Sequence, residues 1–244
     1  MTDEMENMEF VEDAVVIEDV HCQLPKRILM VVTNACEAQN HDRTGVWLEE
    51  FAVPYLAFIK QDYMVTVATP TGDIAPVDPA SESLIRDIKW NEAKKALNDT
   101  LPLDTVDYTV YDAIVLPGGH GPMFDLAKCE ILGEIINYFN KHHKLIAAIC
   151  HGPAGLLPAV SDGIPFVNGR KLTCFTNDEE QAYKKVNMLP FSLEDALKDA
   201  GADFVKDGVG AVNVIQDDNL ITAQNFQSSE AFTKSIIKYL TENE

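Results

Sequence analysis

Hydrophobic residues along the chain occur in short continuous runs, separated by stretches in which they recur at helical spacing. The runs at residues 27–33, 63–69, 111–119 and 144–149 are mostly apolar or β-branched, which predicts strands buried on both faces of a sheet. Segments 44–61 and 125–140 show the helical spacing, and Pro54 is expected to kink or divide the first of them. Strands that alternate with helices indicate a mostly parallel sheet sandwiched by helices.

The remaining segments fit the same plan with shorter elements. Turn-rich residues 70–79 lead into a mixed helical region up to Leu103, which we interpret as a small insertion after the second strand. The other predicted elements are a helix at 153–160, a hairpin at Asn168-Gly169, a helix ended by Gly201, short strands near Phe204, 212–215 and 220–222, and a last helix at 229–240. The sequence thus predicts one doubly wound, flavodoxin-like α/β domain over residues 25–244, with its active site at the carboxyl ends of the strands.

The charge is strongly negative, and part of it is local. Hydrophobic residues make up 46% and charged residues 24% of the chain, as in an ordinary globular protein, but the formal net charge is −20. Residues 1–19 include eight acidic residues and no basic one, so we interpret residues 1–24 as an acidic N-terminal extension. A charge of this sign argues against nucleic acid and anionic membrane surfaces as partners, because both would be repelled.

The sequence shows none of the usual patterns for export, membrane insertion or zinc binding. The N-terminal segment lacks the basic start of a signal peptide, and no apolar run approaches the ~20 residues of a membrane span, so we expect a cytoplasmic protein. No two cysteines have C-x-x-C spacing, which predicts free thiols and neither disulfides nor a zinc site. The cysteines are Cys22, Cys36, Cys129, Cys150 and Cys174.

Cys150 differs from the other cysteines in its position. It ends a predicted strand and is followed by His151, by Gly152, which permits close backbone approach, and by Pro153, which suits the start of a helix. This order predicts a tight turn that projects the sulfur out of the sheet, as in a nucleophile elbow, and a helix start that favours the thiolate. The other cysteines are expected to be small buried residues.

Two further groups are placed near Cys150 by the same reasoning. His151 is a candidate general acid or base if another group orients its ring, and its amide is a natural oxyanion donor. Gly118 and Gly119 end the third strand and let the backbone approach a ligand, so the Gly119 amide is a candidate second donor. His120 is either a wall of the pocket or a solvated loop residue.

The candidate carboxylates are Glu50 and the cluster 178–180. Glu50 follows the first strand, and a carboxyl buried beside a thiolate should be protonated and able to donate a hydrogen bond to the sulfur. Asp178, Glu179 and Glu180 are either ordinary residues of a first helical turn, capped by Thr176 or Asn177, or include the group that orients His151.

Several of these segments together resemble a known family. IVLPGGHGPMFDL, AAICHGPAGLL, LTCFTNDEE, PFSLEDALKDAGA and NLITAQNFQSSEA are similar to the PfpI-type superfamily, which has a class I glutamine amidotransferase-like fold. TGVWLEEF and the insertion after the second strand resemble the glyoxalase III branch, which includes heat-shock chaperones of the Hsp class. The resemblance covers about residues 27–240.

The resemblance implies an enzyme and a set of site residues. By similarity, Cys150 is the nucleophile, His151 the base, Glu180 the acidic partner of His151, and Glu50 the carboxyl bonded to the thiol. Glu179 replaces Glu180 if that loop shifts by one residue. The implied activity is a lyase of the D-lactate dehydratase class, which converts methylglyoxal or a related 2-oxoaldehyde to a 2-hydroxy acid without glutathione, metal or other cofactor. The implied assembly is a homodimer.

Other functions fit parts of the sequence. A stress holdase, a thiol redox sensor or a PfpI-like peptidase or amidase would also be compatible with Cys150 in this fold. A true glutamine amidotransferase is disfavoured, because its histidine usually comes from an H-x-E motif and the chain contains none.

Overall fold

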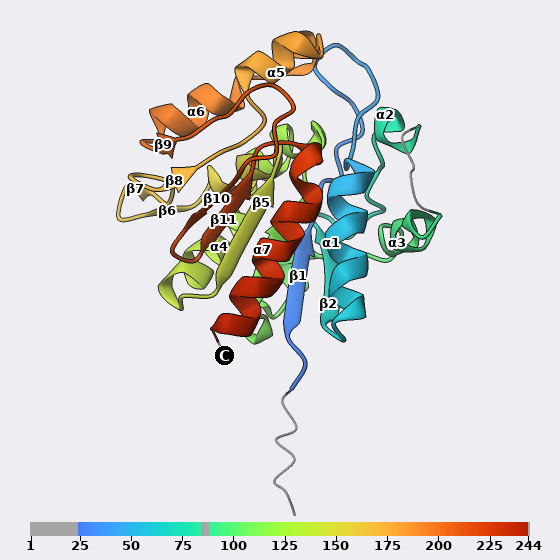
Figure 1. The fold of residues 1–244 in the computed structure, drawn as a ribbon, viewed down its shortest axis with the longest axis vertical. Helices are drawn as coiled ribbons and strands as arrows, with labels where there is room; N and C mark the ends of the chain where they lie inside the picture. Colours follow the sequence, from blue (N-terminus) through green and yellow to red (C-terminus); the bar gives the residue numbers. More distant parts are fainter. Residues whose placement is uncertain (1–23, 84–87, 244) are drawn as a thin grey trace, which may run out of the picture.

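Seven strands form the central sheet of the computed structural model, which describes residues 24–83 and 88–243 (Figure 1). Neighbouring strands of this sheet are parallel except for the β10–β11 pair at one edge. Because β1 lies between β2 and β4, the chain builds the sheet outward in both directions from β1, which makes this a doubly wound fold. Across the sheet the order is β10 (Val214–Asp217), β11 (Leu220–Ala223), β5 (Leu145–Ile149), β4 (Ala113–Leu116), β1 (Arg27–Val31), β2 (Met64–Thr69) and β3 (Leu101–Pro102).

Helices cover both faces of the sheet. On one face, α1 (Leu48–Lys60) and α7 (Ser229–Glu242) lie side by side and bury Phe51 and Phe232. On the other face lies α4 (Glu130–Lys141), whose apolar side chains pack in a second core. Alternate residues of each strand enter opposite cores, so Met30 belongs to the first and Leu29 to the second. The predicted flavodoxin-like sandwich is confirmed.

The predicted helices at residues 44–61 and 125–140 are both present with narrower bounds. α1 continues through Pro54 as one helix, so the predicted division at this residue is wrong; the packing of its buried apolar side chains in the core outweighs the cost of the proline. The second segment begins with a 3-10 turn before α4. The 3-10 helices are η1 (Leu103–Thr105), η2 (Tyr108–Val110), η3 (Gly121–Met123), η4 (Leu126–Lys128), η5 (Gly152–Leu156), η6 (Val186–Met188) and η7 (Phe226–Ser228).

Two local predictions between residues 150 and 172 are wrong. The helix predicted at 153–160 is the short η5, followed by strand β6 (Val160–Ser161). The hairpin is not at Asn168-Gly169 but between β6 and β7 (Ile164–Pro165), where Asp162 and Gly163 both have positive φ, as its tight turn requires. After Asn168-Gly169 the chain also turns, but β8 (Lys171–Leu172) pairs in parallel with the distant β9 (Asp203–Phe204).

The insertion after β2 contributes to the end of the sheet at which the strands terminate. It contains α2 (Pro79–Glu82), α3 (Trp90–Ala96) and β3, which extends the sheet beside β2. Its first part is held to the loop after β1, because the Val46 amide donates to the Pro76 carbonyl and the Asp78 amide to the Val46 carbonyl. At the same end, α5 (Asn177–Ala182) and α6 (Leu193–Asp199) cover the top of the molecule in Figure 1.

Two further points concern the whole chain. Among the described residues, no helix is long and apolar enough to cross a membrane. The proposed acidic extension, residues 1–24, falls almost wholly outside the described residues, so its boundary with the domain remains a prediction.

Candidate active site

Cys150 sits in a tight turn directly after β5. Its φ of +59° lies in the left-handed region that non-glycine residues rarely adopt, and the structure holds it there through two backbone hydrogen bonds. Its amide donates to the Ala223 carbonyl at 2.9 Å, and its carbonyl accepts from the Phe175 amide at 2.9 Å. A side chain at Gly152 would meet the Leu116 carbonyl oxygen at 2.0 Å, which explains the glycine. The structure therefore contains the elbow predicted from the sequence.

A chain of contacts links the Cys150 sulfur to Glu180. Cys150 Sγ lies 3.2 Å from His151 Nδ1, and His151 Nε2 lies 2.6 Å from Glu180 Oε1. All three side chains are buried. The short second contact assigns the Nε2 proton to the Glu180 bond, which leaves Nδ1 facing the sulfur. This is the arrangement in which an imidazole can exchange a proton with a thiol.

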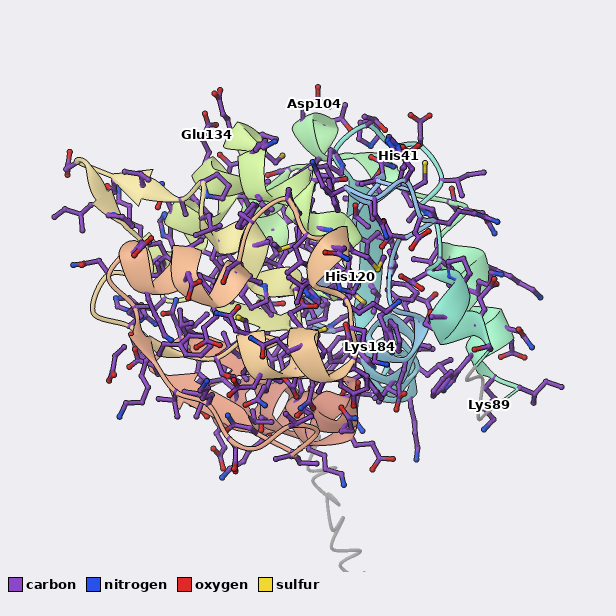
Figure 2. All side chains as sticks on the ribbon, turned by 90° about the horizontal axis from the view of Figure 1, so that it is seen from above. His41, Lys89, Asp104, His120, Glu134 and Lys184 are labelled. Atoms are coloured by element: carbon purple, nitrogen blue, oxygen red, sulfur yellow. The ribbon has the colours of Figure 1, made fainter. Side chains whose placement is uncertain are left out.

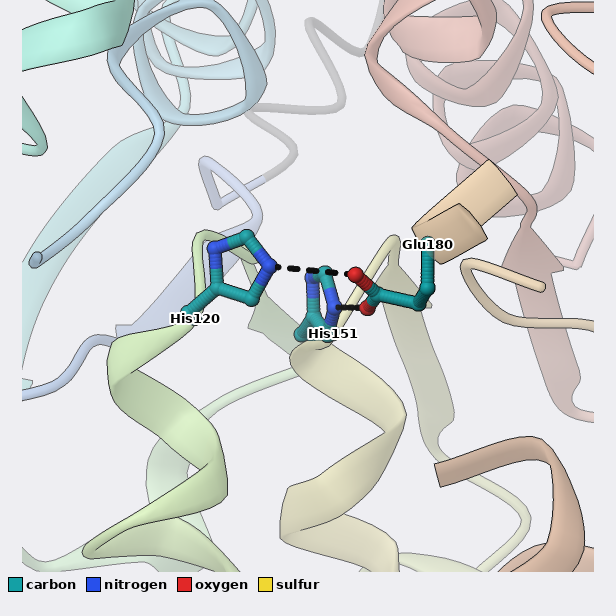
Figure 3. Close-up of side chains that lie close together, drawn as sticks. All are labelled: His120, His151 and Glu180. Atoms are coloured by element: carbon teal, nitrogen blue, oxygen red, sulfur yellow. Dashed lines mark hydrogen bonds and ion pairs between the residues drawn. The ribbon is translucent and has the colours of Figure 1, made fainter. Parts of the chain in front are cut away.

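His120 joins this chain from the end of β4. Its Nε2 lies 3.5 Å from Glu180 Oε2, and its ring lies beside the His151 ring with 4.3 Å between centroids (Figure 3). The sequence left His120 as either a wall of the pocket or a solvated loop residue. The structure places it in the wall, because the residue is only 5% exposed and lines the cavity described below. From above, His120 lies near the middle of this end of the molecule, whereas Glu134 lies toward the rim (Figure 2).

The two neighbouring glutamates of α5 point to different partners. Glu180 contacts His151 and His120, whereas Glu179 accepts hydrogen bonds from Thr176 and from the Asn225 side chain. Thr176 and Glu179 also form a reciprocal capping box at the start of α5. The geometry therefore favours Glu180 over Glu179 as the partner of the histidine.

The two histidines shift the pKa of Glu180. Burial alone would raise the pKa of Glu180, but the charge and hydrogen bonds of His151 and His120 outweigh it and lower the pKa to about 2. Burial lowers the pKa of His120, and the neighbouring His151 lowers it further. Glu180 is thus an anion at neutral pH, while His120 is held in its neutral form.

Glu50, in the first turn of α1, interacts with Cys150 and with the backbone after β4. It is fully buried, and its Oε2 accepts the Gly118 amide proton at 3.0 Å. Burial raises the pKa of Glu50 well above its ordinary 4.5, and hydrogen bonds with Cys150 and with the Gly118 amide oppose this only in part. This agrees with the prediction of a protonated carboxyl beside the sulfur.

The expectation of a thiolate favoured by a following helix is not met. Burial, followed by the neighbouring Glu50 carboxyl, raises the pKa of the Cys150 thiol well above its usual range. The segment after Cys150 is a short 3-10 helix, whose dipole is small, while the sulfur is almost fully removed from water. The isolated thiol is therefore protonated at neutral pH and needs a base to react.

The backbone amides of Gly118 and Gly119, which follow β4, have different hydrogen-bond partners. Gly118 has its amide committed to Glu50 and so cannot donate to a substrate; a side chain there would meet Glu50 Oε2 at 2.6 Å. Gly119 has φ of +92°, and its amide donates a hydrogen bond toward Cys150, where it works against the rise in the thiol pKa. Only Gly119 of the pair therefore keeps the placement expected of an oxyanion donor.

A cavity of about 220 Å³ opens onto these groups. Its walls include Gly119, His120, Cys150 and His151, together with residues that the sequence analysis did not single out. The sequence gives little indication of these lining residues, because the aromatic side chains come from segments far apart in the chain and have the pattern of core residues. The missed lining residues are Trp47, Ala80, Phe175, Tyr183, Lys185 and Phe226.

One group of side chains has the composition of a metal site. Donor atoms of His120, His151 and Glu180 all lie within 4.8 Å of one another. A cation there would have to displace the 2.6 Å hydrogen bond between His151 and Glu180. The absence of a metal in the expected mechanism stays a prediction.

Comparisons with known proteins identify the family to which this chain belongs. The family model described as DJ-1/PfpI matches residues 43–239. This chain belongs to the DJ-1/PfpI family. A glutathione-independent glyoxalase of Schizosaccharomyces pombe is 30% identical over 215 residues, which cover 80% of this chain and 87% of the relative. The PfpI-type membership predicted from the sequence motifs is thereby confirmed.

Solved structures of the family share the fold. One crystal structure, whose name states neither organism nor activity, is 44% identical, with a TM-score of 0.86 over 91% of this chain and all of that chain. The crystal structure of glyoxalase III from Candida albicans is 24% identical, with a TM-score of 0.76 over 87% of this chain and 96% of that chain. At 24% identity, this structural similarity shows that the two proteins share a fold.

Proposed function

We propose that this protein is a glutathione-independent glyoxalase, which converts methylglyoxal or a related 2-oxoaldehyde to a 2-hydroxy acid. The observation that carries the proposal is the continuous contact from Cys150 through His151 to Glu180 at the wall of a small cavity. The relative in Schizosaccharomyces pombe bears this activity in its name, which supports the same assignment here.

The first step is addition of sulfur to the aldehyde carbon. His151 Nδ1, 3.2 Å from Sγ, takes the thiol proton, and Glu180 stabilises the imidazolium through its 2.6 Å bond to Nε2. A carbon–sulfur bond forms and the carbonyl π bond breaks; the alkoxide oxygen then takes the proton from the His151 imidazolium, which gives a neutral hemithioacetal and returns His151 to its neutral form. Amides of Gly119 and His151 stabilise the oxygen as its charge develops.

The second step moves a proton between the two former carbonyl carbons. Neutral His151 removes the proton from the sulfur-bearing carbon, and the ketone oxygen takes up a proton to give an enediol. The neighbouring carbon is then protonated, while the hydroxyl on the sulfur-bearing carbon loses its proton and becomes the thioester carbonyl. The product is a thioester of the 2-hydroxy acid on Cys150, which water hydrolyses to the free acid and thiol. The net reaction adds one water and needs no oxidant or reductant.

Glu50 and His120 support these steps without changing the balance. Glu50, kept neutral by burial, donates a hydrogen bond that stabilises the thiolate as it forms and when it leaves the thioester. His120 shares Glu180 with His151 and closes the cavity beside the reacting carbons. No metal or other cofactor takes part in this scheme.

The preference for a small substrate over a peptide, the cytoplasmic location and the homodimer are also proposals. The cavity of about 220 Å³ and its buried sulfur suit a small molecule better than a peptide chain, which disfavours a peptidase. We retain the cytoplasmic location and the homodimer as hypotheses, the second of which light scattering on the purified protein would test.

The test is NMR analysis of methylglyoxal incubated with the protein in heavy water without glutathione. We expect D-lactate, with solvent deuterium on the carbon that bears the hydroxyl, because the enediol is reprotonated from a group that exchanges with solvent. Transfer as hydride would leave protium there and contradict the proton route. Lactate no faster than in buffer with heat-denatured protein would contradict the function itself.

A further inference from the structure

The cavity above Cys150 has an aromatic wall. Four aromatic side chains line it, and their rings contact one another in a continuous series. Trp47 stacks on Phe226 with 5.1 Å between ring centroids, and Tyr183 lies 6.2 Å from Phe226 and 5.8 Å from Phe175. The wall continues to the catalytic group, because Phe175 lies 5.0 Å from the His151 ring.

These rings come from separate parts of the chain. Trp47 immediately precedes α1, Phe175 and Tyr183 flank α5, and Phe226 begins η7. Several structural elements thus converge to build one apolar surface around a reactive thiol. Pockets that bind flat apolar groups have this composition.

The chemistry of the cavity divides into two ends. At the inner end lie the groups that handle a dicarbonyl, namely Cys150, His151 and the Gly119 amide. The rest of the lining is mainly aromatic and presents almost no polar surface to the cavity, although Ala80 and Lys185 also contribute to it. A methyl group on the ketone carbon would touch only a small part of this wall and leave most of the 220 Å³ to water.

We propose that the preferred substrates are aryl 2-oxoaldehydes, in which an aromatic ring on the ketone carbon packs against Trp47, Phe175, Tyr183 and Phe226. This inference rests on the proposed glyoxalase function and specifies its substrate class. The sulfur adds to the aldehyde carbon as for methylglyoxal, and the product is the corresponding aryl 2-hydroxy acid.

Steady-state kinetics test the proposal directly. With phenylglyoxal and methylglyoxal as substrates, we expect kcat/KM of the wild type to favour phenylglyoxal by about tenfold to hundredfold, the range that extra apolar contacts give in a pocket. Phe226→Leu and Tyr183→Leu remove the ring contacts but keep an apolar, somewhat smaller side chain, so each should lower this preference about twofold to tenfold, by the energy of one aromatic pair.

A matched control comes from an aromatic pair outside the cavity. Tyr108 packs edge to face on Tyr138, with 5.1 Å between centroids, and does not line the cavity. Tyr108→Leu should leave the substrate preference at the wild-type value. A preference lowered equally by Tyr108→Leu and Phe226→Leu would overturn the assignment of the aromatic wall.

A binding measurement separates this inference from the proposed function. In Cys150→Ala, which cannot turn over substrate, mandelate should bind at least tenfold more tightly than lactate by calorimetry, since both are products of the same reaction type. Wild-type lactate formation combined with equal or weaker use of phenylglyoxal would overturn the substrate class alone. Absence of any turnover of either aldehyde would overturn the function on which it rests, and mandelate binding no tighter than lactate would overturn the aryl site independently of catalysis.

Discussion

At the scale of single residues, Glu180 is the point on which the site depends. One buried carboxylate serves two histidines, at 2.6 Å from His151 and 3.5 Å from His120, and both contacts favour its charged form. The resulting pKa of about 2 makes Glu180 a source of folding free energy as well as an orienting group for His151.

Replacing Glu180 by Gln should change both activity and acid stability. Loss of the anion allows the wrong imidazole tautomer, and we expect kcat/KM for methylglyoxal to fall about 10²–10⁴-fold. A pKa of about 2 in the folded state against 4.5 unfolded favours folding above 4.5, by at most about 3 kcal/mol, and this advantage is lost as the pH falls toward 2. Urea unfolding at about pH 5.5 and about pH 3 should therefore show the wild-type advantage over Glu180→Gln shrinking in acid. An advantage independent of pH would contradict the assigned pKa.

Glu50 provides a second test at the same scale, because its proposed role needs a neutral side chain. In Glu50→Gln the amide oxygen can still accept the Gly118 N–H and the NH₂ group can donate to the sulfur, so kcat/KM should stay within about tenfold of wild type. Glu50→Ala leaves the Gly118 amide unpaired and should lose about a hundredfold or more. Equal loss in both variants, measured with the lactate assay, would mean that Glu50 acts as an ionised base.

At the scale of elements, two adjacent residues of α5 have different roles: Glu179 stabilises the structure around the helix, and Glu180 orients His151. Glu179 accepts from the Thr176 amide at 3.0 Å, from the Asn225 side chain at 2.7 Å and from the Gly210 amide at 3.1 Å. These bonds fasten the start of the helix to the loop before η7, and thereby hold Glu180 against His151.

Exchanging Glu179 for Gln should therefore cost stability rather than chemistry. The new NH₂ group would face existing donors and leave them unsatisfied, which should reduce the free energy of unfolding by about 1–3 kcal/mol. Under conditions where the variant stays folded, kcat/KM should remain within about threefold of wild type. Denaturant titration and the lactate assay on the same sample check both parts. A large loss of activity in a fully folded Glu179→Gln would assign the histidine partner to the wrong glutamate.

At the scale of the whole molecule, the sequence predicts most of the sheet and the reactive centre. Continuous apolar runs identified β1, β2, β4 and β5, and the parallel arrangement brings their carboxyl ends together, so residues following each run, such as Cys150 and His120, meet. Short strands are harder to predict from the sequence. The two residues of β8, for example, pair with a strand more than thirty positions away and are too few to show a periodic pattern.

The cavity could not be predicted from residue patterns along the chain. Trp47 and Phe226 stack although about three quarters of the chain separates them, and each has the sequence surroundings of an ordinary core residue. The thiol pKa was also misjudged from sequence, since burial depends on what covers Cys150 rather than on its neighbours in the chain.

The central claim is that Cys150, rather than a general property of the fold, produces the 2-hydroxy acid. Its most direct test is glutathione-free D-lactate formation from methylglyoxal by the wild type, Cys150→Ala and Cys174→Ala. Cys174 is the matched control, because it is also buried and free but does not line the cavity. We expect Cys150→Ala to form lactate at no more than the background rate, while Cys174→Ala retains activity close to wild type. Normal turnover by a folded Cys150→Ala would contradict the claim.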